Sequence, residues 1–475
     1  MSLEVERKFA LTDDQEVPTL PGLGEPEEFA LEAVYYDTRH FALTRARRVV
    51  RRRAGGPDEG WHVKLPGSDA EHRVEHHAPL ASVRLPAELR ALVAEVLDGQ
   101  ALFPAAQLRT RRRQAELRGA DGSVLAQVCL DDVVATVGRA DQSWREVEVE
   151  LVDGDAGVMD AVTSALAEAG IQPAAGQSKI GRTLAAALRA DDQAATGDPS
   201  AVAVVLDYLA AQVGTLQELE PGVRVDLPDA VHRSRVATRR LRTALRTFGP
   251  LFHADAVARL RAELAWHAAE LGAPRDAEVL RDGLLEALDS LGVPPEAQER
   301  GLIAGSLVAA HARAHTELVE TMATSRYDDL HRLLEEWLAD PPLEPAAAAG
   351  SGPVLHGLLD RARGRVTRLY ARALRDPEDL VRWHEVRKAA KAVRYCAEAL
   401  EPAFGGRATG HAAAWEAVTD AFGELQDSLV ARAEVAGLGT DSPVLDALVA
   451  YEIGRGRAEL VRGRAALDAA LAASL

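Results

Sequence analysis

The chain has 475 residues, too many for one ordinary hydrophobic core, so we expect two or more domains. Hydrophobic residues make up 47% of the chain, as in globular proteins, which excludes a disordered or fibrous class. The net charge of -18 argues against a general nucleic-acid binder, so an anion site has to be a local concentration of Arg and Lys.

The cysteines and the amino-terminal residues indicate the compartment. Cys129 and Cys396 lie far apart and offer neither a disulfide framework nor the CxxC spacing of a zinc site. The N-terminus enters a charged strand at once, so we expect no signal peptide, and no apolar run is long enough to cross a membrane. We therefore expect a soluble, cytoplasmic protein.

The first predicted strand, residues 3–9, introduces a pattern that recurs through the first half of the chain. Because side chains in a strand alternate between faces, Glu4, Glu6 and Lys8 share one face. The opposite face is apolar apart from Arg7. An edge strand whose charges face water has the same pattern, so the interpretation depends on matching charges elsewhere.

Later segments alternate in the same way. The β-branched and aromatic content predicts strands or alternating segments at 31–36, 49–53, 61–65, 71–77, 109–117, 124–131 and 144–151. The glycines of 55–60 predict a hairpin connection. Helical spacing predicts helices at 86–98 and 155–169, and Ser178 opens a last short helix.

The charged faces of these strands carry both signs, on different strands. The acidic segments 3–9 and 144–151 are separate from the basic segments 49–53 and 109–113. An open sheet would place these charges in water, but the separation and the use of Arg rather than Lys favour a closed barrel with charges inside. Opposed carboxylates and arginines suit a metal–polyphosphate substrate, because Mg²⁺ or Mn²⁺ takes carboxylate and phosphate oxygens while Arg takes the remaining charge.

The motif Glu4-x-Glu6-x-Lys8 resembles the signature of the CYTH superfamily, the triphosphate tunnel metalloenzymes, and the resemblance covers about residues 1–189. Further matches follow in that family's order: Arg51-x-Arg53, Lys64, Arg73-x-Glu75, the arginines of 109–113, Asp131, Glu146-x-Glu148 and Ser178-Lys179. The resemblance implies an α+β fold with an eight-stranded antiparallel tunnel that holds a triphosphate.

The resemblance also implies roles for individual residues. Glu4, Glu6 and Lys8 would be catalytic. The Mg²⁺ or Mn²⁺ ligands would come from Glu4, Glu6, Glu75, Asp131, Glu146, Glu148 and Glu150. The triphosphate would be held by Lys8, Arg51, Arg53, Lys64, Arg73, Lys179 and one of Arg109, Arg111 and Arg113, of which we prefer Arg111.

The activity implied is metal-assisted hydrolysis of a phosphoanhydride bond, with one metal neutralising charge and a second activating water. The same superfamily contains thiamine triphosphatases, adenylate cyclases and RNA triphosphatases. No purine pocket or thiamine-stacking aromatic residue stands out in the sequence, so inorganic triphosphate is the first choice.

Beyond a polar linker at 190–200, the chain is predicted to be helical. A stretch rich in Pro, Ala and Gly at 341–353 divides this region into repeats of about 201–340 and 353–475. Apolar residues at intervals of three and four predict helices at 201–219, 229–248, 255–271, 275–291, 297–323, 326–339, 353–375, 378–400, 408–436 and 443–472.

The two repeats share a basic stripe. His232-x-x-Arg235-x-x-x-Arg239-x-x-Arg242 matches His384-x-x-Arg387-x-x-x-Lys391-x-x-Arg394, and Leu271-Gly272-x-x-Arg275-Asp276 matches Phe422-Gly423-x-x-Gln426-Asp427. Like charges along one helix face repel each other, so the stripe is costly without a counter-anion. A solvated arginine face would explain a single stripe, but its recurrence in an acidic protein favours an anion site.

This region resembles the CHAD domain over about residues 198–475. The resemblance implies an all-α domain of two pseudo-symmetric helical bundles that binds inorganic polyphosphate, with Asp276 and Asp427 orienting the basic side chains. The polyphosphate-binding residues would be His232, Arg235, Arg239, Arg242, Arg246, His384, Arg387, Lys388, Lys391 and Arg394.

The sequence therefore predicts a triphosphatase tunnel fused to a polyphosphate-binding module, in the cytoplasm and in contact with polyphosphate granules. Its rivals are a non-catalytic polyphosphate-binding or granule-associated protein, and a CYTH enzyme acting on another triphosphate, as a thiamine triphosphatase or adenylate cyclase. Nucleic acid is disfavoured as a partner by the net charge and the scarcity of aromatic residues.

Overall fold

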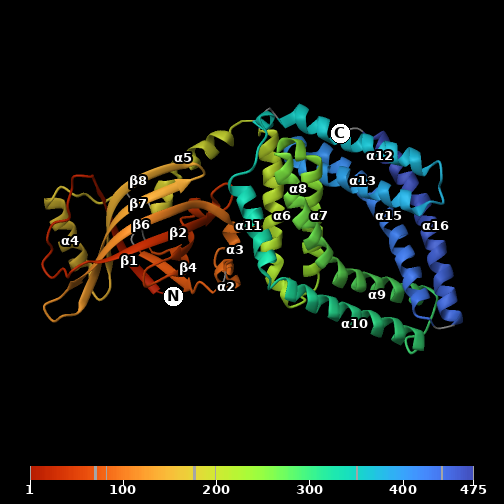
Figure 1. Cartoon of the computed structure of the whole chain (residues 1–475), viewed down its shortest axis with the longest axis horizontal. Helices are drawn as coiled ribbons and strands as arrows, with labels where there is room; N and C mark the ends of the chain where they lie inside the picture. Colours follow the sequence, from red (N-terminus) through yellow and green to blue (C-terminus); the bar gives the residue numbers. More distant parts are fainter. Residues whose placement is uncertain are drawn as a thin grey trace. The chain divides into compact units, whose positions relative to one another are not determined.

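The computed structural model describes residues 2–68, 72–81, 83–174, 178–197, 199–348, 351–439 and 442–473. The chain divides into two compact units, Met1–Gly197 with Glu335–Asp340, and Asp198–Leu334 with Pro341–Leu475. Figure 1 shows strands in the red and orange part of the chain and helices from green to blue. None of the helices among the described residues is apolar over enough of its length to span a membrane.

The first unit contains a closed antiparallel barrel, which confirms the predicted fold class. Over the described residues its order is β1-β5-β4-β3-β2-β6-β7-β8. The strands are β1 (Ser2–Leu11), β2 (Glu27–Asp37), β3 (Val49–Ala54), β4 (Gly60–Pro66), β5 (His72–Ala78), β6 (Phe103–Arg118), β7 (Val124–Val137) and β8 (Ala140–Leu151).

Strand β1 closes the barrel because its two halves have different partners. Its first half pairs with β5, with Glu4 opposite Arg73, and its second half pairs with β8, with Lys8 opposite Glu148. The hairpin between β3 and β4 needs Gly55, whose φ is +80° and whose Cβ would lie 2.2 Å from the carbonyl oxygen of Ala30. The pairing of β1 with β5 and β8 therefore places acidic and basic side chains from distant parts of the sequence next to each other in the barrel.

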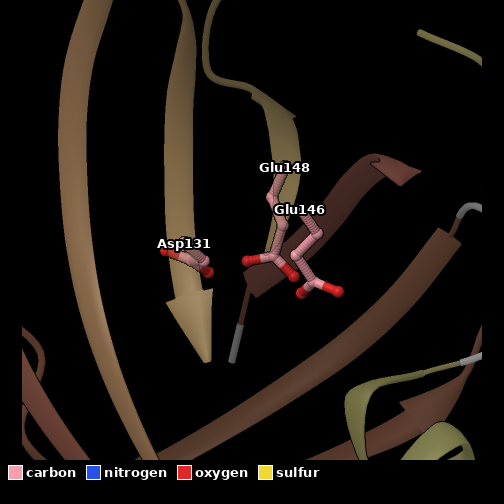
Figure 2. Close-up of side chains that lie close together, drawn as sticks. All are labelled: Asp131, Glu146 and Glu148. Carbon is pink, nitrogen blue, oxygen red and sulfur yellow. The ribbon is translucent and has the colours of Figure 1, made fainter. Parts of the chain in front are cut away.

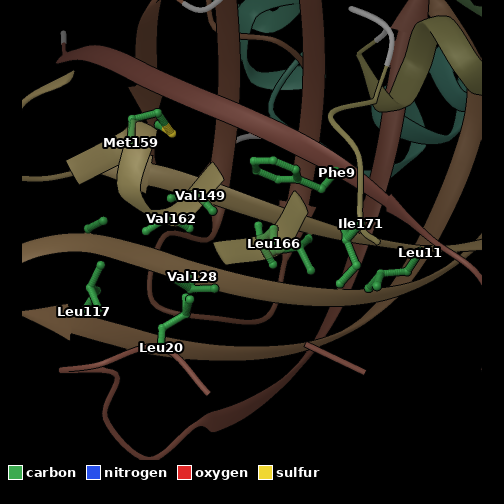
Figure 3. Close-up of a cluster of buried hydrophobic side chains, with 12 residues drawn as sticks. Phe9, Leu11, Leu20, Leu117, Val128, Val149, Met159, Val162, Leu166 and Ile171 are labelled. Atoms are coloured by element: carbon green, nitrogen blue, oxygen red, sulfur yellow. The ribbon is translucent and has the colours of Figure 1, made fainter. Parts of the chain in front are cut away.

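The outer face of the barrel carries hydrophobic cores, as the alternation predicts. Helix α4 (Ala156–Glu168) covers β1, β7 and β8, where Phe9, Val128 and Val149 pack against Leu166 (Figure 3). A second outer cluster joins Trp61 and other residues of β3 and β4 to the short helices α1 (Ala42–Arg45), α2 (Ala87–Ala91) and α3 (Ala94–Leu97). The single helix predicted at 86–98 is thus two short helices.

Helix α5 (Lys179–Ala194) packs against the inward-facing apolar residues of the barrel. Ile180 and Leu184 lie in a cluster with Leu108, Val133 and other buried residues of β2, β6, β7 and β8. The Ser178 hydroxyl accepts a hydrogen bond from the amide of Gly181 and caps the helix. Helix α5 is longer than predicted, because it continues through Ala194 into the segment expected to be linker.

From residue 201 onward the chain is helical. These helices belong to the second unit, except that the residues from Glu335 to Ala339 belong to the first. The helices agree closely with the predicted ranges. They are α6 (Ala201–Arg224), α7 (Ala230–Thr247), α8 (Ala254–Glu270), α9 (Gly272–Ser290), α10 (Gln298–Thr321), α11 (Ser325–Ala339), α12 (Ser351–Ala373), α13 (Leu380–Ala399), α14 (Glu401–Phe404), α15 (Gly406–Gly437) and α16 (Pro443–Ala472), with 3-10 turns at Gly249–Leu251 and Pro345–Ala348.

The helix pairs repeat along the second unit. Helix α6 packs on α7 and α9 on α10, and α12 packs on α13 and α15 on α16 in the same order. The basic helices α7 and α13 also contact each other, as do α9 and α15. A shared core, which includes Leu284, Leu307, Val435 and Leu448, joins α9 and α10 to α15 and α16.

Candidate active site and anion-binding cavity

The barrel encloses a polar cavity of about 300 Å³. The strands place the acidic and basic side chains inside, because the intervening residues pack in the outer cores. Of the residues predicted to bind metal or triphosphate, the cavity is lined by Glu4, Glu6, Lys8, Arg51, Arg53, Lys64, Arg73, Glu75, Glu148, Glu150 and Lys179.

The carboxylates of β1 pair with ammonium groups from β4 and from β1 itself. Lys64 Nζ lies 2.6 Å from both carboxylate oxygens of Glu4. Lys8 Nζ lies 3.3 Å from Glu6 and also pairs closely with Glu148. Burial lowers the pKa of Lys8, but Glu148 and Glu6 outweigh that effect and hold the pKa well above its usual range. Lys8 is therefore a fixed positive charge in the wall.

Three acids from β7 and β8 form a buried cluster, the acidic triad Asp131, Glu146 and Glu148. Figure 2 shows their carboxylates gathered in one place, and each offers an oxygen within 4.8 Å of the others. Lys179 lies among them, with its Nζ 2.7 Å from Asp131, 2.8 Å from Glu146 and 2.7 Å from Glu148. Arg112 adds bonds of 2.7 Å to Asp131 and 2.5 Å to Glu148.

The positions of the β6 arginines correct one prediction. Arg109, Arg111 and Arg113 were expected to face the triphosphate, but Arg112 lines the cavity and none of those three does. The side chain of Arg111 is 71% exposed, whereas that of Arg112 is 14% exposed. Strand β6 has arginine on both faces, so alternation alone cannot choose between them.

A signal that could have resolved the face lies further along β6. Ala115 and Leu117 are buried, and Leu117 packs in the outer core beside α4. These residues share their face with Arg111, so that face points out of the barrel. Arg112 lies on the opposite face, which points into the barrel, and its Nε donates a hydrogen bond to Asp131.

The basic wall contains donors with no acceptor among the described residues. Nε of Arg51, Nε of Arg53 and Nη1 of Arg73 are buried without a hydrogen-bond partner. Burial and the neighbouring guanidinium groups of Arg51 and Arg112 lower the pKa of Arg53 to about 9. Buried donors without acceptors are costly, and an anion in the cavity would satisfy them.

His62 supports this wall from β4. Its Nδ1 lies 2.8 Å from Glu75 and its Nε2 lies 2.9 Å from the carbonyl oxygen of Asp58. Burial, Arg51 and Arg53 lower the pKa of His62 to about 4 against the opposing effect of Glu75. Glu75 is fixed between His62 and the basic residues Arg51 and Lys64, at 3.6 Å and 3.8 Å respectively.

Glu150 differs from the other acids of the cavity. Within the part of the chain that the structure describes, no ion pair is formed by its carboxylate. Burial and the nearby charges of Glu4, Glu6 and Glu148 raise the pKa of Glu150 to about 7. This part of the wall has an excess of negative charge over positive charge.

The donor set fits a hard divalent cation. Clustered carboxylate oxygens are the ligands that Mg²⁺ and Mn²⁺ prefer, and thiolate or imidazole sites are absent from the clusters found among the described residues. Cys129 lines the cavity, but burial raises the pKa of its thiol to about 12, so it stays protonated. The residues that could hold metal are thus the acidic triad with Glu4, Glu6 and Glu150.

The second unit contains a larger cavity, of about 600 Å³, between α7, α9, α13, α15 and α16. Six of the ten predicted polyphosphate-binding residues line it: His232, Arg235, Arg239, His384, Arg387 and Lys391. Arg275 and Arg455, which were not predicted to bind anion, also line it. The basic stripes of both repeats therefore face one cavity.

Two acids and one glycine organise these basic side chains. Asp276 forms a close ion pair with Arg235. Asp427 lines the same cavity near Arg387, whose Nη2 would lie only 3.2 Å from a Cβ at Gly423. The glycine of the second repeat therefore leaves room for this guanidinium group.

The other four predicted residues lie outside the cavity lining. Arg242, Arg246 and Lys388 are exposed and point away from the cavity. Arg394 was predicted to bind polyphosphate, but its guanidinium group forms ion pairs with carboxylates, including Glu398 at 3.0 Å and Glu416. Its place in the spaced motif reflects an ion-pair network between α13 and α15.

Comparison with known proteins agrees with both halves. The sequence matches the CYTH domain over residues 2–183 and the CHAD domain over residues 207–436. An uncharacterized protein of Mycobacterium tuberculosis, from strains CDC 1551 / Oshkosh and H37Rv, is 34% identical over 462 residues, covering 90% of this chain and 87% of the relative.

Two solved structures are similar to part of this chain. PptA from Streptomyces chartreusis is 25% identical, with a TM-score of 0.47, over 57% of this chain and 99% of that protein. The CHAD domain from the plant Ricinus communis is 23% identical, with a TM-score of 0.47, over 57% of this chain and 93% of that domain. By its two domain matches and by relatives that it matches over most of their length, the chain belongs to the family of proteins that join a CYTH domain to a CHAD domain.

Proposed function

We propose that the barrel is a divalent-metal-dependent triphosphatase that hydrolyses inorganic triphosphate or short polyphosphate. The observation that carries this proposal is the cavity itself, in which carboxylates and cationic side chains line one enclosed space. Such a space suits a linear, highly charged anion together with Mg²⁺ or Mn²⁺. Membership of the CYTH family supports the same reaction class.

The residues that line the barrel cavity have different roles in the proposed reaction. Arg51, Arg53 and Arg73 direct guanidinium donors at phosphate oxygens and hold the chain of phosphates in line. Lys8 remains protonated and stabilises negative charge that develops on the leaving phosphate. The acidic triad with Glu4, Glu6 and Glu150 would hold the metal, which would supply charge neutralisation and make a water molecule more acidic. Glu4 and Glu6 are the catalytic carboxylates in this scheme, because they lie on the cavity wall.

A phosphate-release assay tests the enzyme. With triphosphate and Mg²⁺ or Mn²⁺, we expect turnover by the wild type and a loss of at least about 100-fold in the Glu4→Gln, Glu6→Gln double variant. Glu27→Gln on the exposed start of β2 is the matched control and keeps wild-type activity. If the protein hydrolysed thiamine triphosphate, or converted ATP to cyclic AMP, faster than it hydrolysed triphosphate, the assigned substrate would be wrong. Binding of triphosphate without any turnover would favour a non-catalytic binding protein.

For the second unit, we propose binding of inorganic polyphosphate in the larger cavity. Basic residues from α7 and α13 face each other across it, and Nε of Arg387 is buried without a partner among the described residues. Guanidinium groups in a row suit the repeating phosphates of a polyanion. This module would hold the protein at polyphosphate granules in the cytoplasm.

Direct binding tests the module. We expect Arg239→Met and Arg387→Met each to weaken the affinity for a long polyphosphate by about 10–100-fold. This factor corresponds to the free energy that one hydrogen bond to a charged group contributes. Arg259→Met, on the exposed face of α8, is the control and leaves the affinity unchanged. Equal affinity in all three variants would rule out this cavity as the binding site.

A further inference from the structure

The strongest unexplained feature of the barrel is the position of the Lys179 ammonium. It lies within 2.7 to 2.8 Å of an oxygen from every member of the acidic triad. Its side chain is 10% exposed, while Asp131 is fully buried. A lysine that served only as a phosphate ligand would not need three carboxylate partners.

The ammonium and a metal ion cannot share this position. The three oxygens lie within 4.8 Å of one another, which leaves room for one cation between them. Mg²⁺ binds carboxylate oxygens at about 2.0–2.1 Å, so it would occupy the space where the ammonium nitrogen lies. Binding of metal to the triad therefore requires that Lys179 leaves.

The triad already has cationic partners. Lys179, Lys8 and Arg112 each lie within ion-pair distance of it, and Lys8 is shared with Glu6. A divalent ion entering alone has to displace the Lys179 ammonium from three carboxylates, which offsets much of its own attraction to them. A metal ion that enters with a polyanion avoids this cost, because the phosphates accept the displaced ammonium.

Lys179 can reach both positions. It is the first residue of α5, directly after the Ser178 cap, and its side chain lines the cavity as well as contacting the triad. A lysine side chain has four flexible methylene groups, so its ammonium can change partners without a change in the backbone.

We propose that Lys179 is an exchangeable counter-ion, which holds the acidic triad until a metal–triphosphate complex arrives and then moves to a phosphate oxygen. Metal and triphosphate consequently bind as a coupled pair, and each raises the affinity for the other by the same factor. The identity of the anion rests on the proposed triphosphatase function, but the competition between Lys179 and metal does not.

Binding of Mn²⁺ alone, followed through the electron paramagnetic resonance signal of free Mn²⁺, tests the competition. We expect weak binding by the wild type and at least tenfold tighter binding by Lys179→Met, in which the triad has lost its ammonium. Arg189→Met removes an exposed positive charge from the same helix and is expected to match the wild type. Equal or weaker Mn²⁺ binding by Lys179→Met than by the wild type would overturn the proposal.

A second arm uses the wild type only, so it remains decisive if Lys179→Met fails to fold. Imidotriphosphate resists hydrolysis but chelates Mn²⁺ in solution, so this arm uses equilibrium dialysis, in which free and chelated Mn²⁺ equalise across the membrane. The analogue is expected to increase the Mn²⁺ affinity of the wild type at least tenfold, and no increase would overturn the coupling. Because neither arm needs turnover, an inactive protein can still pass the first arm. Failure of the triphosphatase assay is thus distinguishable from failure of this proposal.

Discussion

At the scale of single residues, Arg112 and Arg111 form a natural pair for comparison, since they are adjacent and face opposite sides of β6. Arg112 binds Asp131 and Glu148, so Arg112→Met removes one cation from two buried carboxylates, which keep Lys179 and, for Glu148, Lys8 as partners. We expect a loss of about 1.5–3 kcal/mol in the free energy of unfolding and of about 100-fold in kcat/KM for triphosphate.

Arg111→Met removes the same charge from the outer surface. Among the described residues Arg111 pairs with Asp132, at 3.4 Å, and an exposed pair of this kind contributes less than about 1 kcal/mol. Chemical denaturation and steady-state kinetics on both variants decide the matter. If Arg111→Met lost more activity than Arg112→Met, the assignment of the inner face would be wrong.

Lys391 gives the second cavity a dependence on pH. Burial and the guanidinium groups of Arg239, Arg387 and Arg235 lower its pKa to about 6, against the weaker attraction of Asp427. Burial also lowers the pKa values of His232 and His384. Without a bound anion, Lys391 is therefore neutral above pH 6, and an anion that restores its charge must bring about proton uptake.

Polyphosphate affinity is accordingly expected to rise as the pH falls from 8 to 6, by up to about tenfold per pH unit for one coupled proton. Below pH 6 this contribution levels off, and the histidines add theirs. Titrations at constant ionic strength measure the slope. Lys391→Arg, which stays protonated throughout, should flatten it, and an unchanged slope in that variant would contradict the assignment.

At the scale of secondary structure, alternation and helical spacing predict most of this fold. Every second residue of β1 and β8 faces the cavity, because Phe9 and Val149 fill the outer core. Periodicity does not supply what depends on tertiary contacts. It favoured the face of β6 that carries Arg111, whereas Arg112 faces the cavity, and it could not show that Arg394 is held by acids from α15.

Helix α15 offers a change that separates binding from stability. Gly423→Ala places a methyl group 3.2 Å from Nη2 of Arg387, so the guanidinium group has to shift. Alanine also favours the helix by about 0.5–1 kcal/mol relative to glycine. We expect severalfold weaker polyphosphate binding with unchanged or slightly higher stability.

Gly410→Ala is the control on the same helix, since a Cβ there meets nothing within 4 Å. It should gain the same helix stability without any effect on polyphosphate. Thermal unfolding and a binding titration on the two variants are sufficient. Equal binding by both would show that Arg387 tolerates the methyl group, and the role of Gly423 as space for that side chain would be withdrawn.

At the scale of the whole molecule, the chain has a net charge of -18, yet cationic side chains are concentrated in the linings of its two cavities. The larger cavity also contains Asp276, Glu424 and Asp427, so its positive charge is local and directional. The net negative charge of the chain would repel an extended nucleic acid, whereas the proposed ligand, a thin polyphosphate chain, would meet the local cluster of cationic side chains.

Competition between the two polyanions tests this selectivity. With fluorescently labelled polyphosphate bound, we expect unlabelled polyphosphate to displace it at least tenfold better than single-stranded oligo(dT) at equal phosphate concentration. Bases are bulky, and the described lining of the cavity includes no Trp, Tyr or Phe on which they could stack. Because added salt weakens both interactions, the comparison is made at one ionic strength of about 0.15 M. Equal displacement by DNA would show that phosphate charge alone governs binding, and the cavity would then not be what selects the ligand.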